Sequence, residues 1–208
     1  MVVRARQVIS RSPSRVVYKF PSIKLRRMVY CESSLELNYA YLLDSDHGVS
    51  SFQEQPGKIK YFINDKVHSY TPDFLANRPQ KKQVVEVKLE SKITTKENLI
   101  LFEAIAPICR QAGYEFVVIT DVEIRKQPKL DNIKLFWRYG RTPIYSQHQV
   151  YCQEFFTLKH EAELGELFEF FANRKEGRAV IYSLLYWGVV GIDINKSVNP
   201  DSVVHMPI

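Results

Sequence analysis

One short stretch, Val85-Glu86-Val87-Lys88, constrains the fold of this 208-residue chain more than any other. Its apolar and charged residues alternate, and a period of two is typical of a β-strand that has one apolar face. Glu86 and Lys88 then point to one side of a sheet, while Val85 and Val87 point to the other. Because Val84 lengthens the apolar run, we expect a central strand, in which two charged side chains need a specific reason to be present.

A second carboxylate lies just upstream, in Tyr70-Thr71-Pro72-Asp73-Phe74. A Pro-Asp pair at a strand end, followed by Glu-x-Lys on the next strand, brings two carboxylates and an ammonium together. Carboxylates are hard oxygen ligands for a divalent ion, and a nearby cation suits the hydrolysis of a phosphodiester. Taken singly, Asp73 also fits a turn or helix cap, and Glu86 with Lys88 fits a solvated edge strand with an ordinary ion pair.

A third acidic group is predicted on a helix. Residues 32–44 carry apolar side chains at helical spacing, and Asp46-His47-Gly48 ends the pattern. Glu32 and Glu36 are four residues apart, so they share one face of this helix. Either acid can complete a metal pocket, and the alternative for Glu36 is an ordinary surface carboxylate.

The remaining pattern predicts an α/β core with a mixed sheet. Pro107 is expected to kink or end the helix that contains it. A short strand is expected within the basic arm, over residues 16–20. The expected core strands cover residues 49–54, 58–63, 66–70, 83–88 and 115–120, with a helix over 94–111. Beyond residue 128 the pattern becomes helical, with helices predicted over 131–139, 160–173 and 179–187 and a strand over 188–194. Helix, turn, helix and strand are the outline of a small winged-helix module.

Charge is distributed unevenly along the chain. The net charge is +6, yet the first 30 residues contain eight basic side chains and no acid. A basic arm before a nearly neutral body favours contacts with nucleic-acid phosphates, and the alternative is a solvated tail. From residue 151 onward there are eight acidic and five basic residues, which suits a protein partner better than DNA.

Several classes of protein are excluded. No apolar run reaches the roughly 18 residues that span a bilayer, and residues 1–15 lack the apolar core of a secretory signal. Cys31, Cys109 and Cys152 are widely spaced and odd in number, which favours free thiols in a reducing compartment over a zinc site.

Four ordered motifs resemble those of the TnsA-type endonucleases of heteromeric transposons. They are Cys31-Glu32-Ser33-Ser34-Leu35-Glu36, Gln53-Glu54-Gln55-Pro56, Tyr70-Thr71-Pro72-Asp73-Phe74 and Val85-Glu86-Val87-Lys88. The resemblance spans residues 28–125 and extends more loosely to Tyr182-Ser183-Leu184-Leu185-Tyr186-Trp187-Gly188. It implies a restriction-endonuclease-like core of the PD-(D/E)xK superfamily, with a mixed central sheet flanked by helices and a small winged-helix-like C-terminal domain.

The resemblance also assigns roles at the site. Glu36 becomes the helix acid, Asp73 the central metal ligand and Glu86 the second strand acid. Lys88 becomes the catalytic lysine, and the Val87 carbonyl is a further candidate metal ligand. Some family members carry glutamine at the position of Glu86, so the family pattern does not always require a carboxylate there. Further candidates for contacts beside the site or with DNA are Glu32, Gln55, Lys96, Arg26 and Arg27.

The implied function is a Mg²⁺-dependent endonuclease, with Mn²⁺ able to substitute, that cuts the 5′ strands at transposon ends in double-stranded DNA. The implied partners are a separate transposase and an AAA+ ATPase regulator, with no membrane, in the bacterial cytoplasm beside the nucleoid. The expected divisions are a basic arm (1–30), a nuclease domain (31–127) and a winged-helix-like region (128–208). A free-standing restriction or repair nuclease and a catalytically inactive DNA-binding scaffold are the alternatives.

Overall fold

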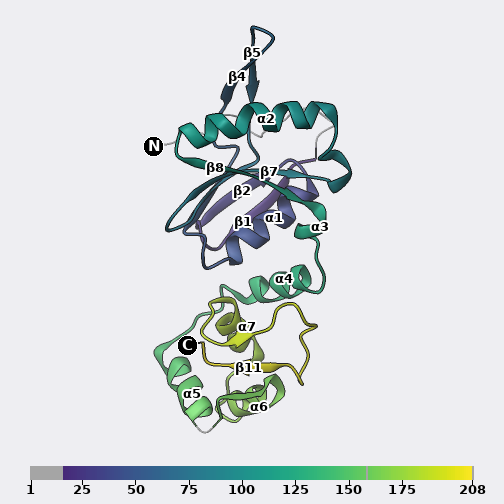
Figure 1. The fold of residues 1–208 in the computed structure, drawn as a ribbon. Coiled ribbons are helices and arrows are strands. Elements are labelled where there is room, and N and C mark those ends of the chain that lie inside the picture. Colours follow the sequence, from purple (N-terminus) through teal and green to yellow (C-terminus); the bar gives the residue numbers. More distant parts are fainter. Residues whose placement is uncertain (1–15, 158, 208) are drawn as a thin grey trace. The chain divides into compact units, whose positions relative to one another are not determined.

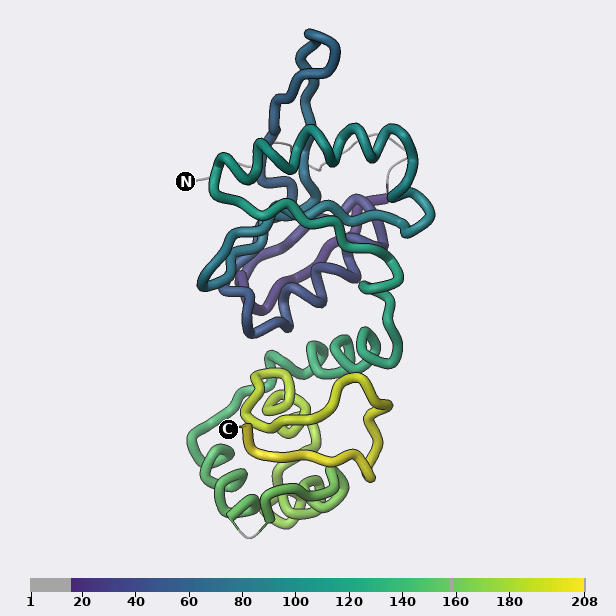
Figure 2. Tube along the Cα trace, in the orientation of Figure 1, coloured from purple at the N-terminus to yellow at the C-terminus, as the bar shows by residue number. Residues whose placement is uncertain are grey.

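The computed structural model describes residues 16–157 and 159–207 and has a mixed α/β fold (Figures 1 and 2). The chain divides into two compact units, Met1–Arg125 and Lys126–Ile208. The first half of the predicted basic arm, residues 1–15, lies outside the described residues. Within the described part of the chain, no helix is both long enough and apolar enough to cross a membrane.

A mixed four-stranded sheet forms the centre of the first unit. Its order is β3 (Ser51–Glu54), β6 (Phe74–Asn77), β7 (Lys82–Lys88) and β8 (Tyr114–Thr120). The first three strands pair antiparallel, and β7 pairs parallel with β8. A parallel neighbour requires a crossover connection, which α2 (Lys96–Gln111) provides after a 3-10 turn at Glu90–Lys92. The predicted central strand is confirmed, because β7 has a partner on both edges.

Two helices cover opposite faces of this sheet. Val84 belongs to a buried cluster with Ile105 and Cys109 of α2. Val85 points the other way, and its cross-strand neighbour Phe74 makes an edge-to-face ring contact with Tyr39 of α1 (Ser34–Ser45). Figure 1 shows the sheet between α1 and α2. Glu86 and Lys88 therefore share the α2 side of the sheet with Val84, as the alternation predicted.

A hairpin occupies part of the predicted arm. Strands β1 (Tyr18–Ser22) and β2 (Arg27–Cys31) pair antiparallel, and the hairpin packs against α1. Phe20, Val29 and Cys31 are fully buried. The expected boundary at residue 30 thus does not mark the edge of the fold, because these apolar side chains belong to the core of the first unit.

A second hairpin stands out beyond α2 (Figures 1 and 2). It consists of β4 (Ile59–Ile63) and β5 (Lys66–Tyr70), as predicted. Asn64 and Asp65 both adopt positive φ, at 48° and 60°. This two-residue turn matches the right-handed twist of the strands that it joins. After β8, the short helix α3 (Asp121–Ile124) ends the first unit.

The second unit is a set of helices with a small sheet. In chain order it contains α4 (Lys129–Tyr139), α5 (Ser146–Thr157), β9 (Glu161–Glu163), α6 (Leu164–Ala172), α7 (Arg178–Tyr186), β10 (Gly191–Ile192) and β11 (Val203–His205). The antiparallel sheet has the order β10-β11-β9. The predicted apolar stripe is confirmed as core, since Leu164, Leu167 and Phe171 are fully buried and Phe168 nearly so.

Some predicted bounds were wrong. The helix expected from residue 160 begins at Leu164, because Glu161–Glu163 pairs with β11 instead. The strand expected over 188–194 contracts to Gly191–Ile192, and α5 and β11 were not expected. In the first unit, Pro107 does not end α2, which continues to Gln111.

Candidate active site

Glu86 and Lys88 lie near the C-terminal end of β7 as a close ion pair. The Lys88 Nζ is 2.5 Å from Glu86 Oε1, and the Glu86 side chain is 4 % exposed, whereas that of Lys88 is 29 % exposed. The Tyr70 hydroxyl donates a hydrogen bond to the other oxygen, Glu86 Oε2. Both carboxylate oxygens of Glu86 are thereby held, and the lysine retains access to solvent.

Asp73 is fixed against the same strand. Its Oδ2 accepts a hydrogen bond of 2.7 Å from the backbone N–H of Val87, the residue between Glu86 and Lys88. Burial raises the pKa of Asp73 well above its usual range, and the charges of Glu86 and Glu36 raise it further. Part of the residue remains exposed to solvent. Asp73 is thus a half-buried residue in a site that disfavours the negative charge of its carboxyl group.

Glu36 approaches from the first turn of α1 and also caps that helix. Its Oε1 accepts a hydrogen bond from Ser33 Oγ at 2.8 Å, and its Oε2 accepts one from the Glu32 N–H at 2.8 Å. The Ser33 Oγ in turn accepts a hydrogen bond from the Glu36 N–H, so Ser33 is the N-cap residue of α1. Burial raises the pKa of Glu36, against the effect of these hydrogen bonds, and the charges of Glu32 and Glu86 contribute. The carboxylate therefore has a structural role and is also coupled electrostatically to the site.

Lys88 is the ammonium among these acids. Burial alone would lower the pKa of Lys88, but the charges of Glu86, Asp73 and Glu36 outweigh burial and raise it. Without a metal ion, Lys88 is therefore protonated at neutral pH. Asp73, Glu86 and Lys88 thus lie together at the end of β7, and Glu36 is coupled to them through its charge.

The donor set fits Mg²⁺ in its chemistry. Among the described residues, no three Asp, Glu, His or Cys side chains gather closely enough to hold a metal ion by themselves. Mg²⁺, however, is usually held by one or two carboxylates and several waters, which Asp73 and Glu86 can supply. The raised pKa of Asp73 reflects burial and mutual repulsion of the carboxylates, which a divalent cation would relieve. The expected set of three carboxylates, with Glu36 included, is not preassembled.

The remaining candidates are placed differently. Gln55 is buried at a backbone φ of 45°, and its N–H donates to the Asp73 carbonyl at 2.9 Å. Its side-chain Oε1 has no hydrogen-bond partner within the described part of the chain. Glu32 is half-buried beside Glu36, Lys96 is exposed at the start of α2, and Arg26 is exposed in the β1–β2 turn.

Arg27 has a structural partner that the sequence did not predict. Its guanidinium donates to both oxygens of Glu54, at 2.9 and 2.7 Å, and the Glu54 side chain is 2 % exposed. This bidentate pair joins β2 to β3. Because β2 leads directly into the Ser33 cap, the pair also fixes the start of α1, which carries Glu36.

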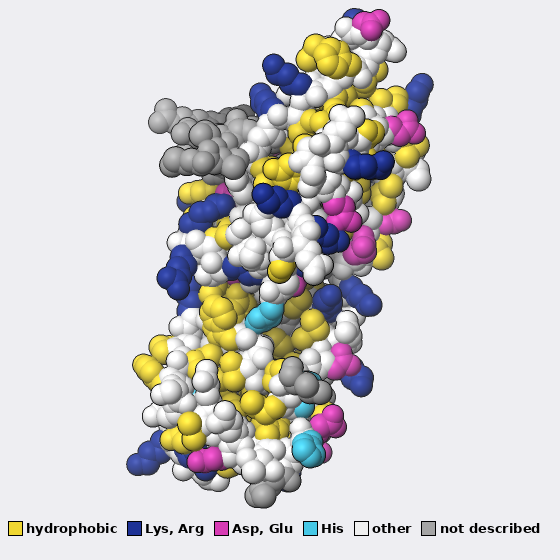
Figure 3. All heavy atoms as spheres, turned by 60° about the vertical axis from the view of Figure 1, so that its left-hand side comes forward, with side chains coloured by type: hydrophobic (Ala, Val, Ile, Leu, Met, Phe, Trp, Pro, Cys, Tyr) yellow, Lys and Arg dark blue, Asp and Glu magenta, His cyan; other side chains and the backbone are white. Residues whose placement is uncertain are grey.

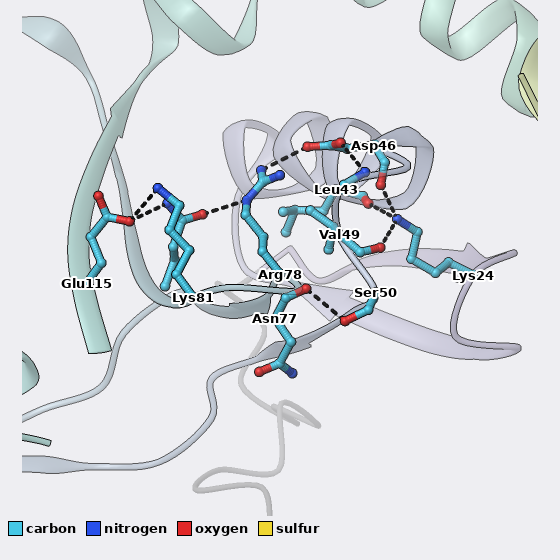
Figure 4. Close-up of polar contacts among 11 residues, drawn as sticks. Lys24, Leu43, Asp46, Val49, Ser50, Asn77, Arg78, Lys81 and Glu115 are labelled. Carbon is cyan, nitrogen blue, oxygen red and sulfur yellow. Dashed lines mark hydrogen bonds and ion pairs between the residues drawn. The ribbon is translucent and has the colours of Figure 1, made fainter. Parts of the chain in front are cut away.

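The opposite end of α1 is held by a second polar cluster (Figure 4). The Lys24 Nζ donates to the carbonyls of Leu43, Asp46 and Val49 at 2.9, 2.5 and 2.5 Å. The guanidinium of Arg78, just after β6, pairs with Asp46 Oδ2 at 2.8 Å. The helix that positions Glu36 is therefore tied to the hairpin and the sheet at both of its ends.

Sequence reasoning missed Tyr70 and Ser33 as supporting residues. Tyr70 stands in the motif that contains Asp73, but only the β4–β5 register places its hydroxyl beside Glu86. Ser33 had a detectable signal, since Ser-x-x-Glu before an apolar helix is typical of a capping box.

The mixed sheet, with Asp73 beside the strand that carries Glu86 and Lys88, is compatible with a nuclease core. Residues 46–121 match the model of a family described as TnsA-like endonuclease N terminal. The match supports the resemblance, and it shows that residues 46–121 are similar to the N-terminal domain of TnsA-like endonucleases. The match covers less than half of the chain and includes Asp73, Glu86 and Lys88 but not Glu36. A search among curated proteins gave no match.

Proposed function

We propose that this chain is a Mg²⁺-dependent endonuclease that cleaves the 5′ strands at transposon ends during cut-and-paste transposition. The TnsA-like domain indicates a nuclease related to transposition. The single observation that carries the proposal is the coupling of Asp73, Glu86 and Lys88 within that domain. The choice of strand follows from the family resemblance, in which a separate transposase cuts the other strand.

Asp73 and Glu86 would hold the metal ion, with the Val87 carbonyl and Glu36 as further candidate ligands. Bound there, Mg²⁺ or Mn²⁺ would acidify a water molecule and neutralise charge on the scissile phosphate. The protein contributes orientation. The Val87 N–H fixes Asp73, and the Tyr70 hydroxyl fixes Glu86. Such contacts to ligating carboxylates set ligand direction and tune affinity for the metal.

Lys88 acts as a cation in this proposal. Its raised pKa keeps the ammonium charged, so it suits stabilising the negative charge of the phosphate or orienting the attacking water. The surrounding carboxylates, which raise the pKa of Lys88, oppose a role for it as a neutral base. Replacement of Lys88 by Ala is expected to abolish nicking while DNA binding, measured by fluorescence anisotropy, stays nearly unchanged. Retained nicking would remove Lys88 from the mechanism.

The second unit is proposed to be a winged-helix-like module that contacts the transposase and the AAA+ regulator. Its strand order supports this, because β9 precedes the helices α6 and α7, β10 and β11 follow them, and all three strands join one antiparallel sheet. The assignment is tested by copurifying each partner with the full chain and, separately, with a chain that ends at Arg125. If the truncated chain recovers as much of each partner as the full chain does, the assignment is contradicted.

Transposition products provide the decisive test. Cells carrying this chain and the transposition genes encoded beside it would be compared with cells carrying Asp73→Ala. A switch from simple insertions to fused donor–target cointegrates is expected, because uncut 5′ strands leave the element joined to its donor. Unchanged simple insertions would instead favour the scaffold alternative. Robust cutting by the isolated wild-type protein, without partners, would favour a free-standing nuclease.

A further inference from the structure

The β4–β5 hairpin presents an apolar pair to solvent. Phe62 and Val67 are direct cross-strand neighbours, and they are 71 % and 60 % exposed. Lys60 and Ser69 form the next pair on the same face of the hairpin. A large aromatic side chain that is mostly exposed at the end of a projecting element gains no stability from burial there, so its placement calls for a partner.

The base of the same hairpin is anchored in the fold. Ile59 and Tyr61 lie on the opposite face of β4 and pack against the buried cluster that contains Tyr70, Ile105 and Cys109. The apolar residues of one face are thus partly covered by α2, whereas none of the described residues gives comparable cover to the other face. The exposed pair therefore lies on a hairpin whose other face is packed against the core of the first unit.

Charge indicates the kind of partner. Lys58, Lys60 and Lys66 are all exposed, and the only acid in residues 58–70 is Asp65 in the turn. Within the described residues, none of the three lysines forms an ion pair. Lysine is depleted from protein–protein interfaces, but it contacts nucleic-acid phosphates and releases their counterions. Figure 3 shows hydrophobic and basic side chains near one another toward this end of the first unit.

We propose that the β4–β5 hairpin is a DNA-reading ribbon that enters the major groove, with Phe62 and Val67 against base edges and the lysines against phosphates. The major groove of B-DNA admits a two-stranded ribbon, and an apolar side chain there contacts the thymine methyl group. The inference deepens the proposed function and rests on it, because the partner is the duplex that the active site would cut.

The chain connects this ribbon directly to the active site. β5 ends at Tyr70, whose hydroxyl holds Glu86, and Asp73 follows three residues later. Val67 is three residues from Tyr70, which is about 10 Å along a strand. Since base pairs are spaced about 3.4 Å apart, this separation equals about three base pairs, so the ribbon would contact the duplex close to the cleaved bond. The ribbon thereby sets where the cut falls.

Photo-crosslinking tests the contact directly. In full-length Asp73→Ala protein, p-benzoylphenylalanine would replace either Phe62 or Val122, an exposed residue of α3 in the same unit (64 %). The probe is an end-labelled duplex several helical turns long and of arbitrary sequence. Crosslinks to DNA are expected from position 62 and not from position 122. Equal crosslinking from both, no crosslink to DNA, or crosslinks from position 62 only between copies of the protein would overturn the proposal.

Affinity variants separate the two kinds of contact. The double variant Phe62→Thr/Val67→Thr keeps β-propensity and is expected to weaken binding roughly tenfold without changing its salt dependence. Lys60→Ala/Lys66→Ala is expected to reduce the slope of log K against log salt by about two, and Val122→Thr serves as the control. Guanine N7 methylation should weaken binding by the wild type but not by the threonine variant, because N7 lies in the major groove.

Two affinity results would also refute the ribbon. One is wild-type affinity in the threonine variant, and the other is no binding of the duplex by the wild-type protein. The proposed function is tested independently. It would be refuted if the Asp73→Ala protein still supported simple insertions, and that result would not change the expected crosslink at position 62.

Discussion

The hydroxyl of Tyr70 provides the sharpest test of how the site is built. Tyr70 is 9 % exposed, and it donates to Glu86, which is 3 % exposed. Burial, followed by the charge of Glu86, raises the pKa of Tyr70 far above its usual range, so the hydroxyl is a proton donor at every working pH. The substitution Tyr70→Phe removes this donor and leaves the ring in the buried cluster.

The expected loss of stability depends on the charge of Glu86, which accepts this hydrogen bond. A hydrogen bond to a charged group contributes about 1.5–3 kcal/mol, because its loss leaves a buried carboxylate oxygen unsatisfied. In a domain of this size, about 2 kcal/mol corresponds to a fall in melting temperature of roughly 4–12 °C. If Glu86 also holds the metal ion, losing the contact that orients it should raise the Mg²⁺ concentration at half-maximal nicking about 10- to 100-fold.

The assays are thermal unfolding in EDTA and nicking across a Mg²⁺ titration. Tyr114→Phe is the matched control, because Tyr114 packs on the same cluster and no hydrogen bond of its hydroxyl is among those described. That variant should leave both measurements unchanged. A Tyr70→Phe protein with wild-type stability and wild-type Mg²⁺ dependence would show that the hydroxyl does not support Glu86. If stability falls but the Mg²⁺ dependence of nicking stays unchanged, Glu86 is not a metal ligand.

Three further predictions concern charge. The raised pKa of Asp73 means that its contribution to stability is present below the usual Asp pKa and is lost as pH rises through the folded value. Metal-free Asp73→Asn should therefore melt higher than wild type at neutral pH and lose this advantage in acid. Mg²⁺ at about 100 times its Kd should stabilise wild type by about 2.7 kcal/mol and Asp73→Asn not at all. Arg27→Met should cost about 2–3 kcal/mol in urea unfolding, since it leaves the Glu54 carboxylate buried, and adding Glu54→Gln should recover most of this. Lys24→Met should destabilise the first unit by about 1–3 kcal/mol, measured the same way, because three carbonyls near the end of α1 lose their donor.

Local patterns predicted the elements that carry the active site. The alternation through Val85 and Lys88 identified β7, and Asn64-Asp65 identified the β4–β5 turn, because each signal depends on neighbouring residues only. The α2 bounds were close for the same reason, with Thr95 as the observed cap. Pro107 does not end α2, and Ile105 and Cys109 on either side of it are buried in the core.

Long-range pairing could not be predicted in the same way. The three residues of β9 form a strand only because β11, about forty residues later, pairs with them. The Arg27–Glu54 and Tyr70–Glu86 contacts also join residues that are far apart in sequence, so no local period reveals them. The double role of Glu36 was hidden as well, since a capping carboxylate and a metal ligand look identical in sequence. The structure identifies the cap, and the ligand role stays a prediction.

The pairing of Lys88 with Glu86 suggests how the site changes state when substrate arrives. Without a metal ion, the ammonium provides the positive charge nearest to these buried carboxylates, and its attraction to them raises its own pKa. A divalent ion beside Asp73 and Glu86 would take over that neutralising role. The Glu86 oxygen that Lys88 contacts would then become a metal donor, and the charged lysine, 29 % exposed, would turn to the phosphate. Lys88 and a metal ion would then compete for the Glu86 carboxylate, so a Lys88→Ala protein should bind Mg²⁺ at least as tightly as wild type while failing to cleave. Isothermal titration with Mg²⁺ measures this, and clearly weaker binding by the variant would refute the exchange.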